Sequence, residues 1–225
     1  REVTNSEFRK FKASHDSGRL DGAALNGEAQ AVVNVSWDDA ARYCNWLSRK
    51  QGLAEAYSEK AGKMVAVSPM TTGYRLPYEA EWAWVARKQG NQSERRYPWK
   101  GLYPPTVKSG NYADVSIADT LADTIPAYDD GFRGVAPVAS FAAVPEGFYD
   151  LGGNVAEWMH DYYTVYPGQA NKQVTDPSGP ATGNHHVVRG SSWRHGSITE
   201  LRLSYRDYSS KQRYDLGFRI ARYAE

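Results

Sequence analysis

The sequence is organised around residues 148–158, which read FYDLGGNVAEW. The adjacent Gly152 and Gly153 let the backbone bend where a side chain would clash, so this run cannot be a regular helix or strand. A bend turns carbonyl oxygens inward, and Asp150 and Glu157 could then close an oxygen cage around a hard cation such as calcium. A glycine-rich turn whose acids face water explains the same residues, so the run alone leaves both interpretations open.

Composition narrows the class of protein. The chain has 225 residues, of which 41% are hydrophobic, and its mean hydropathy of −0.66 indicates a soluble globular protein. No apolar run approaches the roughly 20 residues that a membrane helix needs, so no membrane insertion is expected. The net charge of +1 gives no electrostatic reason to expect nucleic acid. The single cysteine, Cys44, excludes an intrachain disulfide, and its place in an apolar stripe indicates a small core residue.

The aromatic content indicates the kind of fold, and the first residues indicate whether the chain is a fragment. The 7 Trp and 16 Tyr, together with 20 Gly, indicate a loop-rich fold held together by large rings. The first residues lack the pattern of a signal peptide, so we expect none within residues 1–225. Residues 1–4 nevertheless lead directly into a predicted helix, without a flexible segment before it. We therefore expect a fragment of a longer chain or a processed chain.

Two helices are predicted near the start of the chain. Thr4 and Glu7 have the spacing of a capping box, which predicts a short helix over residues 5–12. Residues 36–39 resemble a second capping box, and the apolar stripe that follows predicts a helix ending near Gly52.

The rest of the chain changes in character. Residues 78–87 predict a third helix that Gly90 ends, and from residue 91 to 190 no helical period of useful length follows. Glu81 suits the positive N-terminal end of this helix, although it could also pair with Arg75. The predicted strands cover residues 138–141, a run that begins at 186, 200–207 and 216–221, and the predicted loops cover 13–31 and 53–73.

A second candidate ion site precedes the first in the sequence. Asp114 and Asp130 could supply carboxylates, and Val115 and Phe132 could supply carbonyl oxygens. Asp130 is followed by glycine, which is an ordinary turn signal, so a plain turn also explains this run.

Seven short runs keep their order and spacing from one end of the chain to the other. They are Glu2-Val3-Thr4-Asn5, Val35-Ser36-Trp37-Asp38-Asp39-Ala40, Arg75-Leu76-Pro77 with Glu79-Ala80-Glu81-Trp82, Tyr97-Pro98-Trp99, Gly153-Asn154-Val155 with Glu157-Trp158, Arg189-Gly190 with Ser192-Trp193, and Leu216-Gly217-Phe218-Arg219. Together they resemble the formylglycine-generating enzyme, or sulfatase-modifying factor, family. The resemblance implies one domain over residues 1–225 with an α+β fold, an irregular C-type lectin-like fold with little regular secondary structure.

The resemblance also implies two structural calcium ions. The first would be held by Asp114, the carbonyl of Val115, Asp130 and the carbonyl of Phe132. The second would be held by Asp150, the carbonyls of Gly153 and Val155, and Glu157. The same two runs were identified above as candidate ion sites from their carboxylates and carbonyls, so we expect Ca²⁺ at both.

The chain departs from the family at the active site. Members that oxidise a peptide cysteine to formylglycine use two cysteines, which bind copper, just after a Gly-Ser-Trp-type turn. In this chain the two positions fall at or near His195 and near Ile198, and neither is cysteine. A thiolate copper site is therefore missing, and we expect neither copper nor formylglycine-generating oxidase activity.

Several residues remain in the region of the family cleft. They are Ser192, Trp193, His195, Tyr205 and Arg206. His195 could ligate a metal or act as a base, although a lone histidine in a loop is usually a surface residue. Ser192 beside His195 lacks both a nucleophile elbow and an obvious third member, which argues against a hydrolase. Arg206 could bind a carboxylate or stack on a ring, or it could pair with Asp207 or Asp215.

Two classes of function remain open. The first is a calcium-stabilised, non-catalytic binding or interaction domain that holds a peptide, a glycan or a partner protein. The second is a diverged oxidoreductase of the same family, similar to relatives in siderophore maturation. The missing cysteines favour the first. Weak calcium sites suit extracytoplasmic modules, which bind the ion at about 10⁻⁴–10⁻³ M, so we expect a periplasmic or cell-surface location.

Overall fold

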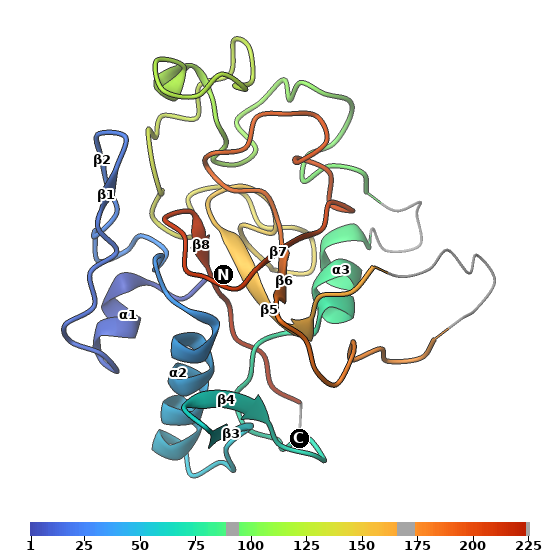
Figure 1. Ribbon diagram of the computed structural model, residues 1–225. Coiled ribbons are helices and arrows are strands. Elements are labelled where there is room, and N and C mark those ends of the chain that lie inside the picture. Colours follow the sequence, from blue (N-terminus) through green and yellow to red (C-terminus); the bar gives the residue numbers. More distant parts are fainter. Residues whose placement is uncertain (89–94, 166–173, 224–225) are drawn as a thin grey trace.

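The computed structural model describes residues 1–88, 95–165 and 174–223, and Figure 1 traces the chain. The helices in these ranges are α1 (Asn5–Arg9), α2 (Trp37–Lys50), α3 (Glu79–Arg87) and the 3₁₀ turn η1 (Val115–Ile117). The strands are β1 (Arg19–Leu20), β2 (Ala23–Ala24), β3 (Tyr57–Lys60), β4 (Lys63–Ala66), β5 (Ala156–Tyr162), β6 (His186–Arg189), β7 (Asp207–Ser209) and β8 (Leu216–Gly217). Long irregular connections join them, so the fold is α+β with little regular structure, as predicted.

The largest sheet has the strand order β7-β6-β5-β8 within the described ranges. β5 and β6 are antiparallel with Glu157 opposite Arg189, whereas β5 and β8 are parallel with Ala156 opposite Leu216. The prediction that the 148–158 run contains no regular strand is wrong for its last three residues, because β5 begins at Ala156. The irregular turn that precedes Ala156 leads directly into the centre of the sheet (Figure 1).

The capping box of α1 forms as predicted, but the helix is shorter than predicted. Thr4 accepts a hydrogen bond from the Glu7 backbone N–H at 3.2 Å, and the Glu7 carboxylate accepts one from the Thr4 N–H at 2.9 Å. The helix ends at Arg9 rather than at Lys12. The amide of Phe11 bonds to the carbonyl three residues earlier, which tightens the last turn into 3₁₀ geometry.

α2 confirms the second predicted helix. Ser36 is its N-cap and accepts a hydrogen bond from the Asp39 N–H at 3.1 Å. The stripe that includes Ala40, Tyr43 and Cys44 is buried in the largest hydrophobic core. Cys44 is therefore a core residue, as predicted, and its thiol is free and buried.

Two buried tryptophans tie α2 to β5. Trp37 donates its indole N–H to the carbonyl of Met159 at 2.8 Å, and Trp158 donates its own to the carbonyl of Val35 at 3.0 Å. Both rings lie in the same core cluster as Phe8. A large ring whose one polar atom is satisfied can be fully buried, so these contacts fix the central strand against the helix.

Two of the predicted loops contain hairpins. Residues 13–31 include the β1–β2 pair, and residues 53–73 include the β3–β4 pair. Both hairpins turn through glycine at positive φ, Gly22 at 79° and Gly62 at 78°. The polar, glycine-rich composition predicted the turns but concealed the short strands beside them.

Two predicted strands are wrong. Residues 138–141 form a turn, in which Ala139 has φ of 60°. Residues 200–206 form successive turns before β7 begins at Asp207. Leu201 and Leu203 are buried there because they enter two different core clusters, so their alternation in sequence does not mark one face of a strand.

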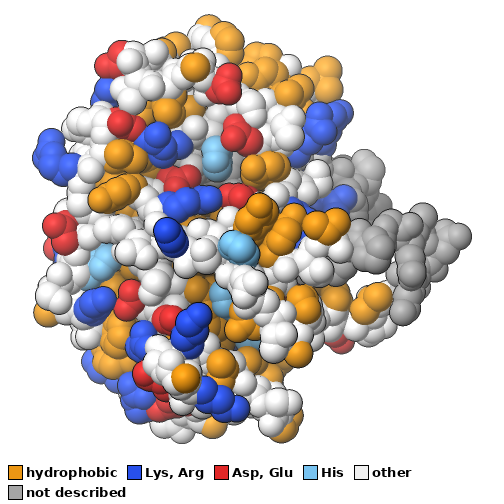
Figure 2. All heavy atoms as spheres, in the orientation of Figure 1, with side chains coloured by type: hydrophobic (Ala, Val, Ile, Leu, Met, Phe, Trp, Pro, Cys, Tyr) orange, Lys and Arg blue, Asp and Glu red, His pale blue; other side chains and the backbone are white. Residues whose placement is uncertain are grey.

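The surface of the described chain has no large region of one charge on the face that Figure 2 draws, where acidic and basic side chains are interspersed. None of the helices within the described residues has the length and apolar character needed to cross a membrane.

Candidate functional site

The turn before β5 depends on backbone conformations with positive φ. Gly153 has φ of 89°, and Asp150 and Asn154 have φ of 54° and 59°. A Cβ on Gly153 would stand 2.8 Å from both the carbonyl oxygen of Asn111 and the ring of Tyr112. The second glycine of the run is therefore required by a close approach of the preceding segment as well as by its own bend.

Glu157 at the end of this turn is buried and ion-paired. Its carboxylate accepts hydrogen bonds from the Trp82 indole N–H at 2.9 Å and from Nε of Arg219 at 2.6 Å. Arg219 also donates to the carbonyls of Tyr149 and Asp150 at 3.0 and 3.1 Å. A guanidinium therefore joins the two ends of the turn. Sequence reasoning missed this role of Arg219, which lies 62 residues from Glu157.

A third carboxyl group, that of Glu2, lies beside the same turn. Glu2 is 1% exposed, and its Oε1 accepts a hydrogen bond from the Asn154 side chain at 2.9 Å. Its Oε2 is buried and has no hydrogen-bond partner among the described residues. Burial, with Asp150 close by, raises the pKa of Glu2 well above its ordinary value.

The residues expected at the second calcium site therefore fit a cation only in part. Glu157 already faces the charge of Arg219, whereas Asp150 uses one oxygen to accept the Ala139 N–H at 2.7 Å. In the part of the chain that the structure describes, no group of three or more His, Cys, Asp or Glu side chains is arranged to hold a metal ion. Backbone carbonyls would have to complete such a site.

Asp114 and Asp130 come together as the first expected site requires. Asp114 is fully buried and accepts hydrogen bonds from the Ser116 N–H at 2.8 Å and the Asp130 N–H at 2.7 Å. Asp130 is 4% exposed and accepts the amides of Tyr112 and Phe132 at 2.9 and 2.8 Å. No salt bridge joins either carboxylate to a basic side chain within the described ranges. Two buried carboxylates without a basic partner are ligands that a divalent cation takes, although each of their oxygens already accepts a hydrogen bond here.

Asp130 gives this pair a testable pH dependence when no calcium is bound. Burial, and Asp114 beside it, raise the pKa of Asp130 to about 7, above the ordinary value of about 3.9. The folded chain then holds a proton that the unfolded chain has lost, so this group lowers stability as pH rises from about 4 to 7. In chelator, the Asp130→Asn variant should gain stability relative to wild type between pH 5 and pH 8, on the order of 1–3 kcal/mol. Urea unfolding of both proteins at the two pH values measures the difference, and an unchanged or opposite difference would contradict the shift.

Ser192 and His195 are adjacent but are not arranged for nucleophilic catalysis. The Ser192 hydroxyl donates to the carboxylate of Asp215 at 2.9 Å, so its proton points away from the imidazole. Nδ1 of His195 accepts the Ser192 backbone N–H at 3.0 Å. The histidine therefore supports the turn, which agrees with the prediction against a hydrolase.

Two members of the predicted cleft lie in the interior instead. Ser192 is fully buried and Trp193 is 1% exposed, where it packs in a core cluster with Val155. The prediction that these two residues line a cleft is corrected by their burial: the large Trp193 ring packs among the apolar side chains of that core cluster instead. His195 and Tyr205 remain half-buried at the surface.

Arg206 binds within the protein. It donates to both carboxylate oxygens of Glu79 at 2.6 and 2.9 Å, and its guanidinium lies over the ring of Tyr163, 5.0 Å from the centroid. Arg206 therefore pairs with a carboxylate and a ring of the protein itself. Asp207 and Asp215 pair instead with Arg213.

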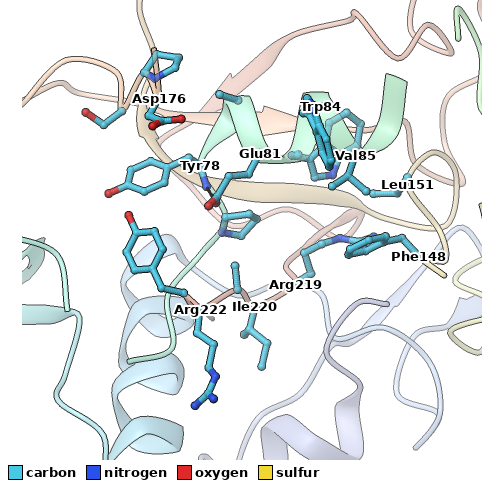
Figure 3. A pocket seen from close by; sticks show the side chains of 17 residues that line it. Tyr78, Glu81, Trp84, Val85, Phe148, Leu151, Asp176, Arg219, Ile220 and Arg222 are labelled. Atoms are coloured by element: carbon cyan, nitrogen blue, oxygen red, sulfur yellow. Dashed lines mark hydrogen bonds between the residues drawn. The ribbon is translucent and has the colours of Figure 1, made fainter. Parts of the chain in front are cut away.

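A cavity of about 820 Å³ lies elsewhere, against α3. Figure 3 shows Tyr78, Glu81 and Val85 on one side of it, with Ile220 and Arg222 from the chain after β8 on the other. This volume is in the range of pockets that enclose small ligands. None of the five predicted cleft residues lines this cavity.

Partly exposed aromatic side chains surround this cavity. Trp84 is 58% exposed, Tyr223 is 42% exposed and Phe148 is 39% exposed. Trp82 is buried, and Trp84 follows it by two residues in the same helix. Residues two apart lie on nearly opposite faces of a helix, so Trp84 points outward. Sequence reasoning missed the cavity because its walls come from segments far apart in the chain.

Glu81 on the cavity wall is held firmly. Its carboxylate makes a bidentate pair with Arg75, with both contacts at 2.7 Å, and accepts the Tyr78 N–H at 2.8 Å. Both roles considered for Glu81, a helix N-terminal acid and a partner for Arg75, are therefore present. Its charge is compensated, and the cavity offers mainly aromatic and aliphatic surface.

Comparison with known proteins identifies the family. A family model described as a sulfatase-modifying factor enzyme 1-like domain matches residues 1–224. The chain belongs to this family. It is 32% identical over 173 residues to the formylglycine-generating enzyme of Bos taurus, and 30% identical over 163 residues to the inactive C-alpha-formylglycine-generating enzyme 2 of Mus musculus. These matches cover 77% and 72% of the chain, but only 37% of each relative.

A solved structure agrees with this assignment to the sulfatase-modifying factor enzyme 1-like family. Treponema denticola variable protein 1 is 26% identical, with a TM-score of 0.73 over 97% of this chain and 81% of that protein. The predicted fold, an irregular α+β fold of the formylglycine-generating enzyme type, is thereby confirmed.

Proposed function

We propose that this chain is a calcium-stabilised, non-catalytic binding domain of its family. The observation that carries the proposal is the position of the single cysteine. Cys44 is fully buried in the core beside α2, and burial raises the pKa of its thiol. Oxidising members of the family, as the resemblance implies, use two cysteines and copper. One buried, protonated thiol cannot supply that site.

Calcium enters the proposal through the pair Asp114 and Asp130. Two buried carboxylates without a basic partner among the described residues are costly unless a cation compensates them. Bound calcium would supply that charge and fix the loops that these residues join. Asp150, Glu157 and nearby carbonyls would hold a second ion, next to the charge of Arg219.

The cavity against α3 supports the binding part of the proposal. It is large enough for part of a peptide, a glycan or a side chain of a partner protein, and aromatic residues such as Trp84 and Phe148 frame it. The inactive formylglycine-generating enzyme 2 of Mus musculus is, by its name, a family member without the activity. A calcium requirement favours a periplasmic or cell-surface location.

Metal analysis of the purified chain tests the proposal. We expect about two calcium ions per chain after equilibration in millimolar calcium, and no stoichiometric copper or iron. A cysteine-containing peptide should not be converted to formylglycine, with or without added copper. The Cys44→Ala variant controls for copper held weakly by the one thiol. Stoichiometric copper or iron together with peptide oxidation would overturn the proposal and support the diverged oxidoreductase.

A further inference from the structure

A second cavity, of about 390 Å³, lies beside the first. The two cavities share Tyr78 and Ser178 in their walls. One carboxylate and two imidazoles line the second cavity: Asp161, His160 and His186. Neither the expected calcium ligands nor the predicted cleft residues line it. The second cavity therefore uses none of the residues expected to bind calcium or to line the family cleft.

Asp161 is a buried carboxylate whose hydrogen bonding is incomplete. It is 2% exposed, and its Oδ2 accepts the Glu79 backbone N–H at 2.7 Å. Within the described ranges, no other residue donates to its Oδ1, and no basic side chain pairs with it. Oδ1 lies 3.1 Å from the point that a Cβ on Gly179 would occupy, and Gly179 lines the cavity. The free oxygen is therefore on the cavity side.

His186 adds a second acceptor. Its Nδ1 lies 3.2 Å from the carbonyl oxygen of His160, and a carbonyl can only accept, so Nδ1 carries the proton. In the neutral ring Nε2 is then an acceptor. Burial lowers the pKa of His186 to about 3, so the ring is neutral at pH 7. It stacks on Trp37 with centroids 3.8 Å apart, which fixes its orientation.

His160 is neutral as well. The Tyr57 hydroxyl accepts the Leu76 N–H at 3.0 Å, so its own proton is free to be donated to Nδ1 of His160, 3.1 Å away. Burial lowers the pKa of His160 to about 4. Neither histidine therefore supplies a positive charge to balance Asp161, and the charge of the cavity wall is negative.

We propose that this cavity binds an alkylammonium group, with Asp161 as its counter-ion and His186 as a second acceptor. An ammonium group has three N–H donors and no acceptor, which matches a wall that offers Asp161 and His186 as acceptors and carries a net negative charge. The rings of Tyr78, Tyr162 and Trp37 in the cavity wall offer cation–π contacts. A neutral or anionic ligand would leave the buried carboxylate uncompensated.

The ammonium group can come from a free amine or from a lysine side chain, and one titration series distinguishes the two. The calcium-loaded chain is titrated with n-butylammonium, with Nα-acetyl-lysine amide and with 1-butanol, the neutral isostere of the amine. The ring signals of His160 and His186 and the carboxyl ¹³C signal of Asp161 are followed by NMR. We expect saturable shifts with n-butylammonium and none with 1-butanol. Binding of the lysine derivative as well identifies a lysine side chain as an accepted source.

The Asp161→Asn variant tests the counter-ion. Its amide oxygen can still accept the Glu79 N–H, so the fold should be retained, but the affinity for n-butylammonium should fall by about tenfold or more. Asp123→Asn, which changes an exposed carboxylate outside the cavity, is the matched control and should bind like wild type. Equal binding of 1-butanol, unchanged affinity of Asp161→Asn, or no shift of the wild-type Asp161 carboxyl signal would overturn the proposal. That last measurement needs no variant to fold.

Discussion

Replacing Glu157 by alanine is expected to lower the free energy of unfolding by about 3–5 kcal/mol. Glu157 is 1% exposed, and the guanidinium of Arg219 that it pairs with is 7% exposed. Removing the acid leaves the buried arginine charge without its hydrogen-bonded counter-ion, and the desolvation cost of that charge is not recovered. The Trp82 indole N–H loses its acceptor in the same change.

Urea unfolding in chelator measures this effect separately from any bound calcium. Asp119→Ala is the matched control, because Asp119 also makes two contacts to one arginine, Arg133, but its side chain is 67% exposed. The exposed pair is well solvated, so its loss should change stability far less.

The double variant Glu157→Ala with Arg219→Met adds a second readout. It removes the orphaned charge as well, so it should be more stable than Glu157→Ala alone. If Glu157→Ala itself does not fold, the double variant and Glu157→Gln still show whether charge is the cause. A loss in Glu157→Ala as small as that in Asp119→Ala would contradict the importance of the buried pair.

Removing calcium is expected to cost about 2–3 kcal/mol of stability per occupied site. A ligand that binds only the folded chain stabilises it by RT ln(1 + [L]/Kd), which is about 2.7 kcal/mol at one hundred times Kd. With a Kd of about 10⁻⁴ M, that condition is reached near 10 mM calcium. Thermal or urea unfolding in calcium, in magnesium and in chelator measures the difference.

The carboxylate pair of the first site locates the effect. Asp130→Asn should lose most of the calcium-dependent gain in unfolding free energy that comes from the first site, because one of its two buried carboxylates is gone. Asp129→Asn is its matched control: Asp129 is the adjacent, exposed carboxylate, and it accepts the Gly131 N–H at 2.9 Å, as an asparagine would. If saturating calcium does not shift the unfolding midpoint of wild type, the calcium part of the proposed function is wrong.

The sequence predicted those parts of the fold that depend on neighbouring residues. The caps at Thr4 and Ser36 follow from side chains that bond to amides three residues away, and both are present. β5 was not predicted, because this strand is defined by its pairing with β6 and β8 rather than by a local pattern. β8 begins 60 residues after β5 does. Residues 200–207 show the converse, since their alternation suited a strand but no partner strand pairs with them before β7.

The candidate site divides in the same way. Asp114 and Asp130 were predicted to converge, because two acidic turns and the family resemblance pointed to the same carboxylates, and they do. The pairing of Arg219 with Glu157 was not predicted, since no local pattern relates the two positions. The two cavities were missed for the same reason: each wall combines a helix or strand with a loop from a distant part of the chain.

The hydrogen bonds at the first residues of the chain affect how folding can proceed during synthesis. Val3 donates to the carbonyl of Phe218 at 3.0 Å, and Val32 donates to the carbonyl of Val3 at 2.9 Å. The core therefore includes contacts that span more than two hundred residues, and such non-local pairing slows folding. On the ribosome, the carbonyl of Val3 can pair with Val32 early, whereas the Val3 N–H has to wait for residue 218.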